Sequence, residues 1–299
     1  MSSTLPTSVD HSFDTTGRAG VRTLLASEWT KLRSVRSTWI SLAVIVVGGI
    51  GFAALFSWVF ANHWAQSGVA DRAQFDPVRI SQAGSFVTEI VVGVLGALVI
   101  TSEYSTGSIR TTVASVPHRP AIAVAKGLIL AVSLFVVTQI TAFISFFVSE
   151  AVLLASGGHQ VPVGETIAQQ IRSASVPVVS ITEAGVAPAI FRAALFLTLM
   201  GLLSLGFGLI VRNTAGTIAL YVVLILVVPL LIQLLPSSIR DHIQPYLPSN
   251  LGTAMASQTS QHTDFAGTLL APWIASIWVV AYVAISLVAG TVLLSRRDA

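Results

Sequence analysis

Six uninterrupted apolar stretches dominate this 299-residue chain, and each is long enough to cross a lipid bilayer as a helix. A bilayer core of about 30 Å requires about 20 helical residues, because each residue advances the helix by about 1.5 Å. The stretches are apolar throughout and do not alternate with a period of two, which favours helices over a β-barrel. The predicted spans are residues 39–60, 80–101, 127–154, 188–211, 215–235 and 272–294.

The composition excludes a soluble domain. Hydrophobic residues make up 54% of the chain and charged residues only 10%, whereas soluble domains carry about 25% charged residues. The net charge of +3 comes from basic residues scattered along the loops, so nucleic acid is not predicted as a partner. Most of the sixteen Lys and Arg residues fall on one side of the predicted topology, and the positive-inside rule then places both termini in the cytoplasm.

A search for catalytic patterns argues against an enzyme. The chain contains no G-x-x-x-x-G-K-[ST] loop for nucleotide phosphates and no H-E-x-x-H zinc motif. All six histidines and every aspartate lie outside the predicted spans, which argues against an intramembrane protease. There is no cysteine, and therefore no thiolate metal site. We expect no catalytic residue, no metal and no cofactor bound by this chain.

The segment before the first span is predicted to be an amphipathic helix over residues 18–38, preceded by a disordered cytoplasmic tail over residues 1–17. Apolar side chains form a stripe along this helix, and basic side chains lie mostly on the opposite face. We therefore expect the helix to lie in the inner membrane interface, with Trp29 and Trp39 at headgroup depth. Simple anchoring by positive charge remains the alternative. The apolar stripe consists of Val21, Leu24, Leu25, Trp29, Leu32 and Val35.

The inner loop after the second span is predicted to contain a short helix over residues 106–117. Ser105 or Thr106 can cap it, Gly107 relaxes its first turn and Pro117 ends it. Lys126, in the helix that follows, is expected to snorkel to the interface. The predicted helix combines an apolar stripe with a cation: Ile109, Val113, Val116 and Arg110. This stripe can either tuck into lipid or dock against another protein.

One acid, Glu89, falls inside a predicted span, where a charge costs about 2.5–3.5 kcal/mol on insertion scales. It can line a cargo path, carry a proton or pair with Arg192 at the outer end of the fourth span. The residues considered for a cargo path are Glu89, Gln139, Phe143 and Gln233. The apolar, proline-rich loop over residues 236–271 is predicted to form re-entrant or interfacial helices on the outer face.

Two segments resemble a known family. The sequence over residues 27–39, which begins Ser-Glu-Trp-Thr-Lys-Leu-Arg and ends at Trp39, is similar to the amphipathic entry helix of bacterial ABC-2 type transporter permeases. The segment from Glu103-Tyr104, through Gly107-Ser108-Ile109-Arg110 and Val116-Pro117, to Lys126 resembles that family's loop between its second and third spans, and the resemblance covers the chain after about residue 18. It implies a coupling helix that contacts an ATPase through Glu103, Tyr104, Gly107, Ile109, Arg110, Val113, Val116, Pro117 and Arg119.

The fold expected is therefore an all-α membrane protein with six transmembrane helices, an interfacial entry helix, a cytoplasmic coupling helix and re-entrant outer helices before the last span. The resemblance implies a permease of an exporter in the bacterial cytoplasmic membrane, with an amphipathic or hydrophobic cargo. The partners implied are membrane lipid, a second permease copy in a homodimer or heterodimer, and an ABC ATPase subunit that binds ATP and Mg. The alternatives are an ion-coupled secondary transporter that depends on Glu89, or a membrane scaffold that transports nothing.

Overall fold

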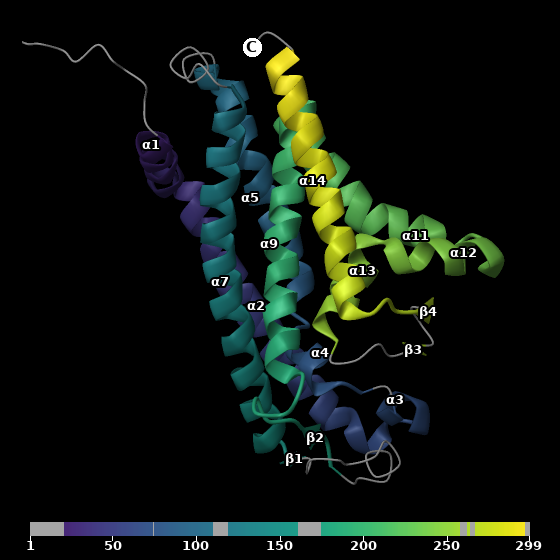
Figure 1. Cartoon of the computed structure of the whole chain (residues 1–299). Coiled ribbons are helices and arrows are strands. Elements are labelled where there is room, and N and C mark those ends of the chain that lie inside the picture. The colour runs from purple at the N-terminus through teal and green to yellow at the C-terminus, as the bar shows by residue number, and fades with distance from the viewer. Residues whose placement is uncertain are drawn as a thin grey trace, which may run out of the picture.

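The computed structural model describes residues 21–73, 75–109, 119–160, 175–257, 262–263 and 267–296, and shows a bundle of long helices (Figure 1). Six helical segments of this part are long and apolar enough to cross a membrane, which confirms the predicted number of spans. They are Arg36–Gln66, Ser85–Thr106, Pro120–Ala155, Val186–Val211, Thr214–Ile232 and Pro272–Arg296. The predicted tail over residues 1–17 lies outside the described residues.

The predicted entry helix ends four residues earlier than expected, at Ser34 instead of residue 38. Helix α1 covers Val21–Ser34, and α2 starts at Arg36 and continues to His63. Val35 separates them in an extended conformation, and the Trp39 indole Nε1 donates to the Arg33 carbonyl across this corner at 2.9 Å. The chain therefore turns sharply from α1 into the first long helix, which the hydrophobic pattern alone did not indicate.

The second long helix starts five residues later than predicted, because a short helix precedes it. The Asp76 carboxylate accepts hydrogen bonds from the amides of Val78 and Arg79 at 2.9 and 3.2 Å, and so caps α4 (Pro77–Ser81). A turn over residues 82–84 follows, in which a Cβ on Gly84 would collide with the Gly49 backbone. Helix α5 then covers Ser85–Thr106. Before α4 lie the 3-10 turn η1 (Trp64–Gln66) and α3 (Val69–Ala73).

Helix α7 is the longest element, from Arg119 to Ala155. Its 37 residues correspond to about 55 Å at about 1.5 Å per residue, more than a bilayer core. The helix continues through Gly127 without interruption, so its first turns extend beyond the length that a bilayer core requires. The two-residue strands β1 (His159–Gln160) and β2 (Pro177–Val178) pair in parallel after it.

Helix α9 (Val186–Val211) forms the centre of the bundle and packs against α5, α7 and α14 (Pro272–Arg296). Glycines allow the close approach: a Cβ on Gly96 of α5 would collide with the carbonyl of Gly201, and one on Gly206 would meet Ser286 of α14. The buried Tyr221 ring lies against Gly93, and its hydroxyl donates to the Glu89 carbonyl at 2.9 Å.

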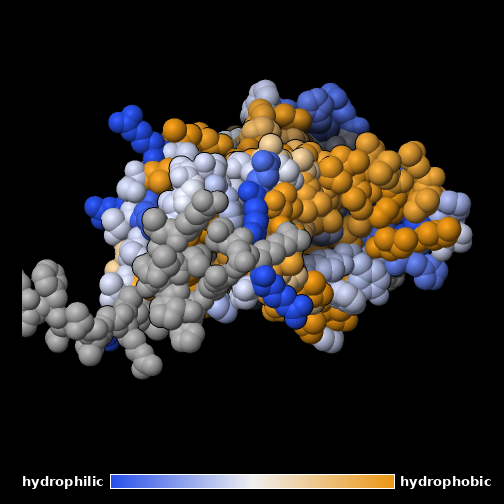
Figure 2. All heavy atoms as spheres, turned by 90° about the horizontal axis from the view of Figure 1, so that it is seen from above, coloured by the Kyte–Doolittle hydropathy of each residue, from blue (hydrophilic) through white to orange (hydrophobic). Residues whose placement is uncertain are grey.

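The fifth span packs on the bundle through α10 (Thr214–Val222) and leaves it along its second half (Figure 1). It consists of α10, a π-helical turn η2 (Val223–Val227) and α11 (Val228–Ile232). Pro229 lacks the amide hydrogen that would bond to the carbonyl four residues earlier, and a widened turn next to it accommodates that loss. Figure 1 shows α11 and α12 (Ser237–Ile243) projecting from the bundle, and Figure 2 shows apolar side chains gathered over this arm.

Short helices fill the loop before the last span, as the sequence indicated. The 3-10 turn η3 (Gln244–Tyr246) and α13 (Pro248–Ala256) follow α12, and the strands β3 (His262–Thr263) and β4 (Gly267–Thr268) pair antiparallel. Helix α13 packs against α9 and α14, with Leu251 and Met255 fully buried. This loop therefore folds back onto the bundle through α13.

Candidate functional site

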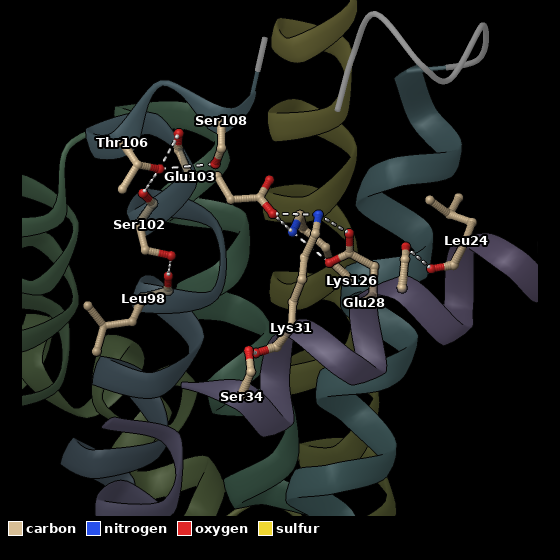
Figure 3. Close-up of polar contacts among 11 residues, drawn as sticks. Leu24, Glu28, Lys31, Ser34, Leu98, Ser102, Glu103, Thr106, Ser108 and Lys126 are labelled. Atoms are coloured by element: carbon tan, nitrogen blue, oxygen red, sulfur yellow. Dashed lines mark hydrogen bonds and ion pairs between the residues drawn. The ribbon is translucent and has the colours of Figure 1, made fainter. Parts of the chain in front are cut away.

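Four charged side chains from three helices meet at one end of the bundle. Glu28 and Lys31 lie one turn apart on α1, Glu103 is in the last turn of α5, and Lys126 is in the second turn of α7. Figure 3 shows the two ammonium groups between the two carboxylates. We call these four residues the ion-pair cluster.

The contacts in the ion-pair cluster form a closed ring of alternating charge. The Lys126 Nζ donates to Glu28 Oε2 and to Glu103 Oε1, at 2.6 Å in each case. The Lys31 Nζ donates to Glu28 Oε1 at 2.8 Å and to Glu103 Oε1 at 2.9 Å. Two carboxylates and two ammoniums neutralise one another, so the cluster carries no formal charge.

Burial makes these contacts strong. Lys126 is 2% exposed, Glu28 4% and Glu103 8%, whereas the Lys31 side chain is 45% exposed. Partial burial alone would lower the pKa of Lys31. Its hydrogen bonds and charge contacts with Glu28 and Glu103 outweigh this effect, so the pKa of Lys31 is raised above 10.5. Buried ions are tolerated only when they are paired and hydrogen-bonded, so the three helices are held in one arrangement.

Lys126 therefore does not snorkel to the interface as predicted. Its ammonium is directed into the protein because two buried carboxylates lie within hydrogen-bonding distance. The sequence carried one signal of this site: Glu28 lies four residues after Leu24 and four before Leu32, within the apolar stripe of α1. An acid on the packing face of an amphipathic helix needs a cation from another element. We did not draw this inference from Glu28 in the sequence.

The loop that leaves α5 begins with a helix end, not a helix start. The Thr106 hydroxyl donates back to the Ser102 carbonyl at 2.9 Å, and Gly107 closes the helix in the left-handed conformation with φ 70°. The predicted capping of a new helix by Ser105 or Thr106 is therefore wrong, because both residues belong to the last turn of α5. Gly107 supplies the left-handed conformation that ends α5.

The described residues place only part of the predicted coupling segment. Ile109 is 4% exposed and belongs to the main hydrophobic core, so this side chain packs within the chain and is not presented to a partner. Tyr104 also packs against that core, and the Arg212 guanidinium lies 5.4 Å from the centre of its ring. Arg110, Val113, Val116 and Pro117 lie outside the described residues, and for Arg119 only the backbone, at the start of α7, is described.

A cavity of about 450 Å³ adjoins the ion-pair cluster. It lies between α1, α2, α5 and α7, and all four cluster residues contribute to its lining. Apolar residues of α5 and α7, such as Leu95 and Leu130, line it as well. The second carboxylate oxygen of Glu103, Oε2, is buried without a hydrogen-bond partner among the described residues. The last turn of α5 therefore retains a buried acceptor that no described donor satisfies.

The predicted cargo-path residues do not form one site. Glu89 lines a second cavity, at the opposite end of α5, which none of the other three residues lines. The Gln139 side-chain amide is buried without a hydrogen-bond partner in the described part of the chain, and Phe143 packs against a separate cluster that contains Phe146. Gln233 is exposed at the end of α11.

The expected pair between Glu89 and Arg192 is not formed. The Arg192 guanidinium instead donates to the carbonyls of Met255 and Ser257, at 2.9 Å each. These bonds tie α9 to the end of α13, because the guanidinium satisfies carbonyls that the short helix leaves open.

The fold and the site define a multi-pass, all-helical integral membrane protein whose long helices are joined by buried ion pairs at one end. A comparison with protein-family models gives the family. The model described as "ABC-2 family transporter protein" matches residues 24–211, more than half of the chain and the part that contains the whole ion-pair cluster. The chain belongs to this family and is a permease subunit without a nucleotide-binding domain. No curated protein matches it.

Proposed function

We propose that this permease exports an amphipathic or hydrophobic cargo across the bacterial cytoplasmic membrane, with both termini on the cytoplasmic side. ATP and Mg bind in a separate ATPase subunit that docks on the loop between α5 and α7, and a second permease copy completes the transporter. The exposed apolar surface of α10 and α11 is available to lipid or to that copy. The single observation that carries the proposal is the ion-pair cluster within an ABC-2 family chain.

The position of the cluster explains how ATP hydrolysis can move the bundle. The loop over residues 107–118 leaves α5 four residues after Glu103 and enters α7 seven residues before Lys126. A displacement of this loop therefore acts on two helix ends that share a buried salt bridge of 2.6 Å. Glu28 connects the same ammonium to α1, so the three helices move together instead of separately.

Co-purification from native membranes tests this assignment. We expect a P-loop ATPase to accompany the wild-type chain and to be reduced at least tenfold with Arg110→Glu, because this change reverses a charge of the docking loop. Arg296→Glu, at the end of α14, is the matched control and should retain the ATPase. If no ATPase accompanies any of the three intact proteins, the chain does not work as a permease of an ATP-driven exporter.

A further inference from the structure

A cavity of about 730 Å³ lies at the end of the bundle opposite the ion-pair cluster. Its walls come from α2, α3, α4, α5, α9 and α13. Figure 1 shows α3 and α4 near the lower end of the bundle and α1 near the upper end, with α13 beside the middle. Small-molecule sites in proteins occupy about 300–1,000 Å³, so this volume fits a ligand of ordinary size.

Aromatic rings supply much of the wall. Five phenylalanines from four parts of the chain line the cavity: Phe56, Phe60, Phe75, Phe86 and Phe196. Phe75 and Phe60 are in ring contact at 5.7 Å between centroids, which fixes one side of the chamber. Rings of this kind bind an apolar body by burial, and their faces attract a positive charge within about 6 Å.

The charged residues of the wall are mostly acidic. Asp71, Asp76 and Glu89 line the cavity together with one arginine, Arg79, among the described residues. Asp71 and Asp76 already accept backbone hydrogen bonds, from Gly68 and from Val78 and Arg79 respectively. Carboxylates outnumber the guanidinium in this wall by three to one, which favours a cation over an anion.

Glu89 differs from the other two acids because one of its carboxylate oxygens is buried without a donor among the described residues. Glu89 is 9% exposed, and the buried oxygen is Oε1. The nearby Tyr221 hydroxyl donates to the Glu89 backbone carbonyl and not to the carboxylate. A buried carboxylate without a partner is costly, and a charge within a membrane span is usually functional. The missing counter-charge has to come from outside the described residues.

We propose that this cavity binds a lipophilic cation, with the Glu89 carboxylate as its counter-charge and the phenylalanine rings around its apolar body. This rests on the proposed function, because it assigns a chemical class to the cargo of that transporter. A neutral ligand of the same shape would leave Glu89 unpaired, and an anion would face three carboxylates. A cation alone, without an apolar body, would leave the aromatic wall unfilled.

One helix connects this cavity to the ion-pair cluster. Glu89 and Glu103 both belong to α5 and are 14 residues apart, which corresponds to about 21 Å of helix. The tight contact between Gly96 and Gly201 holds α5 against α9 between these two positions. Movement of the cluster end of α5 therefore displaces Glu89 relative to the walls contributed by α2 and α13, which provides a way to release the bound cation.

Binding of tetraphenylphosphonium to the purified full chain in lipid nanodiscs tests the proposal. The isosteric anion tetraphenylborate and the neutral triphenylphosphine oxide serve as charge controls. We expect the phosphonium to bind the wild type at least tenfold more tightly than either control, and Glu89→Gln to weaken its affinity at least tenfold. Glu150→Gln, in α7 and outside the cavity wall, is the matched control and should retain full affinity.

A second variant keeps the test valid if Glu89→Gln folds poorly. Ala256→Phe fills the cavity without a change of charge and should also weaken phosphonium binding. Equal binding to wild type and Glu89→Gln, equal binding of the three probes, or no phosphonium binding at all would each overturn the proposal. Because no ATPase is present in this assay, failure here with an ATPase still co-purifying would remove the cavity assignment alone.

Discussion

Replacing Lys126 by methionine should destabilise the permease far more than the same change at Lys31. Lys126 is buried and donates to two carboxylates at 2.6 Å, so its removal leaves Glu28 and Glu103 buried with only Lys31 to share. Breaking a buried ion pair in this way costs about 3–5 kcal/mol. The Lys31 side chain is 45% exposed, and solvent-screened pairs contribute about 0.2–1 kcal/mol.

A second substitution should restore most of the loss. In Lys126→Met with Glu28→Gln, the remaining Lys31 and Glu103 form a neutral pair, so no carboxylate is left unpaired. We expect this double variant to unfold within about 1 kcal/mol of the wild type, since neutral replacements of buried pairs are often tolerated.

Denaturant unfolding in detergent micelles, analysed by linear extrapolation, measures these free energies of unfolding. An equal loss of unfolding free energy in Lys126→Met and Lys31→Met would refute this prediction. Failure of Glu28→Gln to offset the loss caused by Lys126→Met would refute it as well.

Substitutions at Gly96 and Asp76, with Gly51→Ala as a control, test the packing and the entry to α5. Gly96→Ala should lower the free energy of unfolding by about 2 kcal/mol or more, because its Cβ would collide with the Gly201 carbonyl. Gly51 faces open space, so Gly51→Ala should change that free energy by less than about 1 kcal/mol. Equal effects of the two substitutions in a melting assay would contradict the packing of α5 on α9. At Asp76, burial raises the carboxyl pKa above 3.8 despite the amides of Arg79 and Val78, so this group's contribution to stability is largest at low pH and falls as the pH rises from 3.8 through the native pKa. Asp76→Asn keeps the cap of α4 and should flatten this pH dependence. Asp76→Ala removes the cap and should lower the free energy of unfolding by about 1 kcal/mol more than Asp76→Asn does. The same pH dependence of unfolding in wild type and Asp76→Asn would show that the charge is not desolvated.

The six spans could be predicted from the sequence because a bilayer dictates the length and apolarity of each helix independently of its neighbours. The start of the second span could not be predicted from apolarity alone, since residues 80–84 belong to α4 and its turn. A local signal was present: Asp76 followed by Pro77 is typical of a helix start. Hydropathy does not register this signal, because it measures apolarity and not capping chemistry.

The ion-pair cluster depends on tertiary placement. Glu28, Glu103 and Lys126 are separated by 75 and 23 residues, and no periodic pattern relates them. The two segments that resembled the family contain all four cluster residues, but only the packing of α1 against α7 brings Glu28 and Lys31 to Lys126. The Glu89 cavity is likewise formed by α3, α4 and α13, whose short lengths make them weak signals in any sequence window.

The most direct test of the account is whether nucleotide binding moves α5 through the ion-pair cluster. The chain has no cysteine, so spin labels can be placed at Phe86→Cys on α5 and Trp273→Cys on α14, both exposed positions. Distances between the labels are measured by electron spin resonance in the complex with its ATPase, with and without ATP and vanadate. The account predicts a nucleotide-dependent change of distance in the otherwise wild-type chain and none in the stable Lys126→Met, Glu28→Gln variant. An identical change in both would contradict transmission through the cluster.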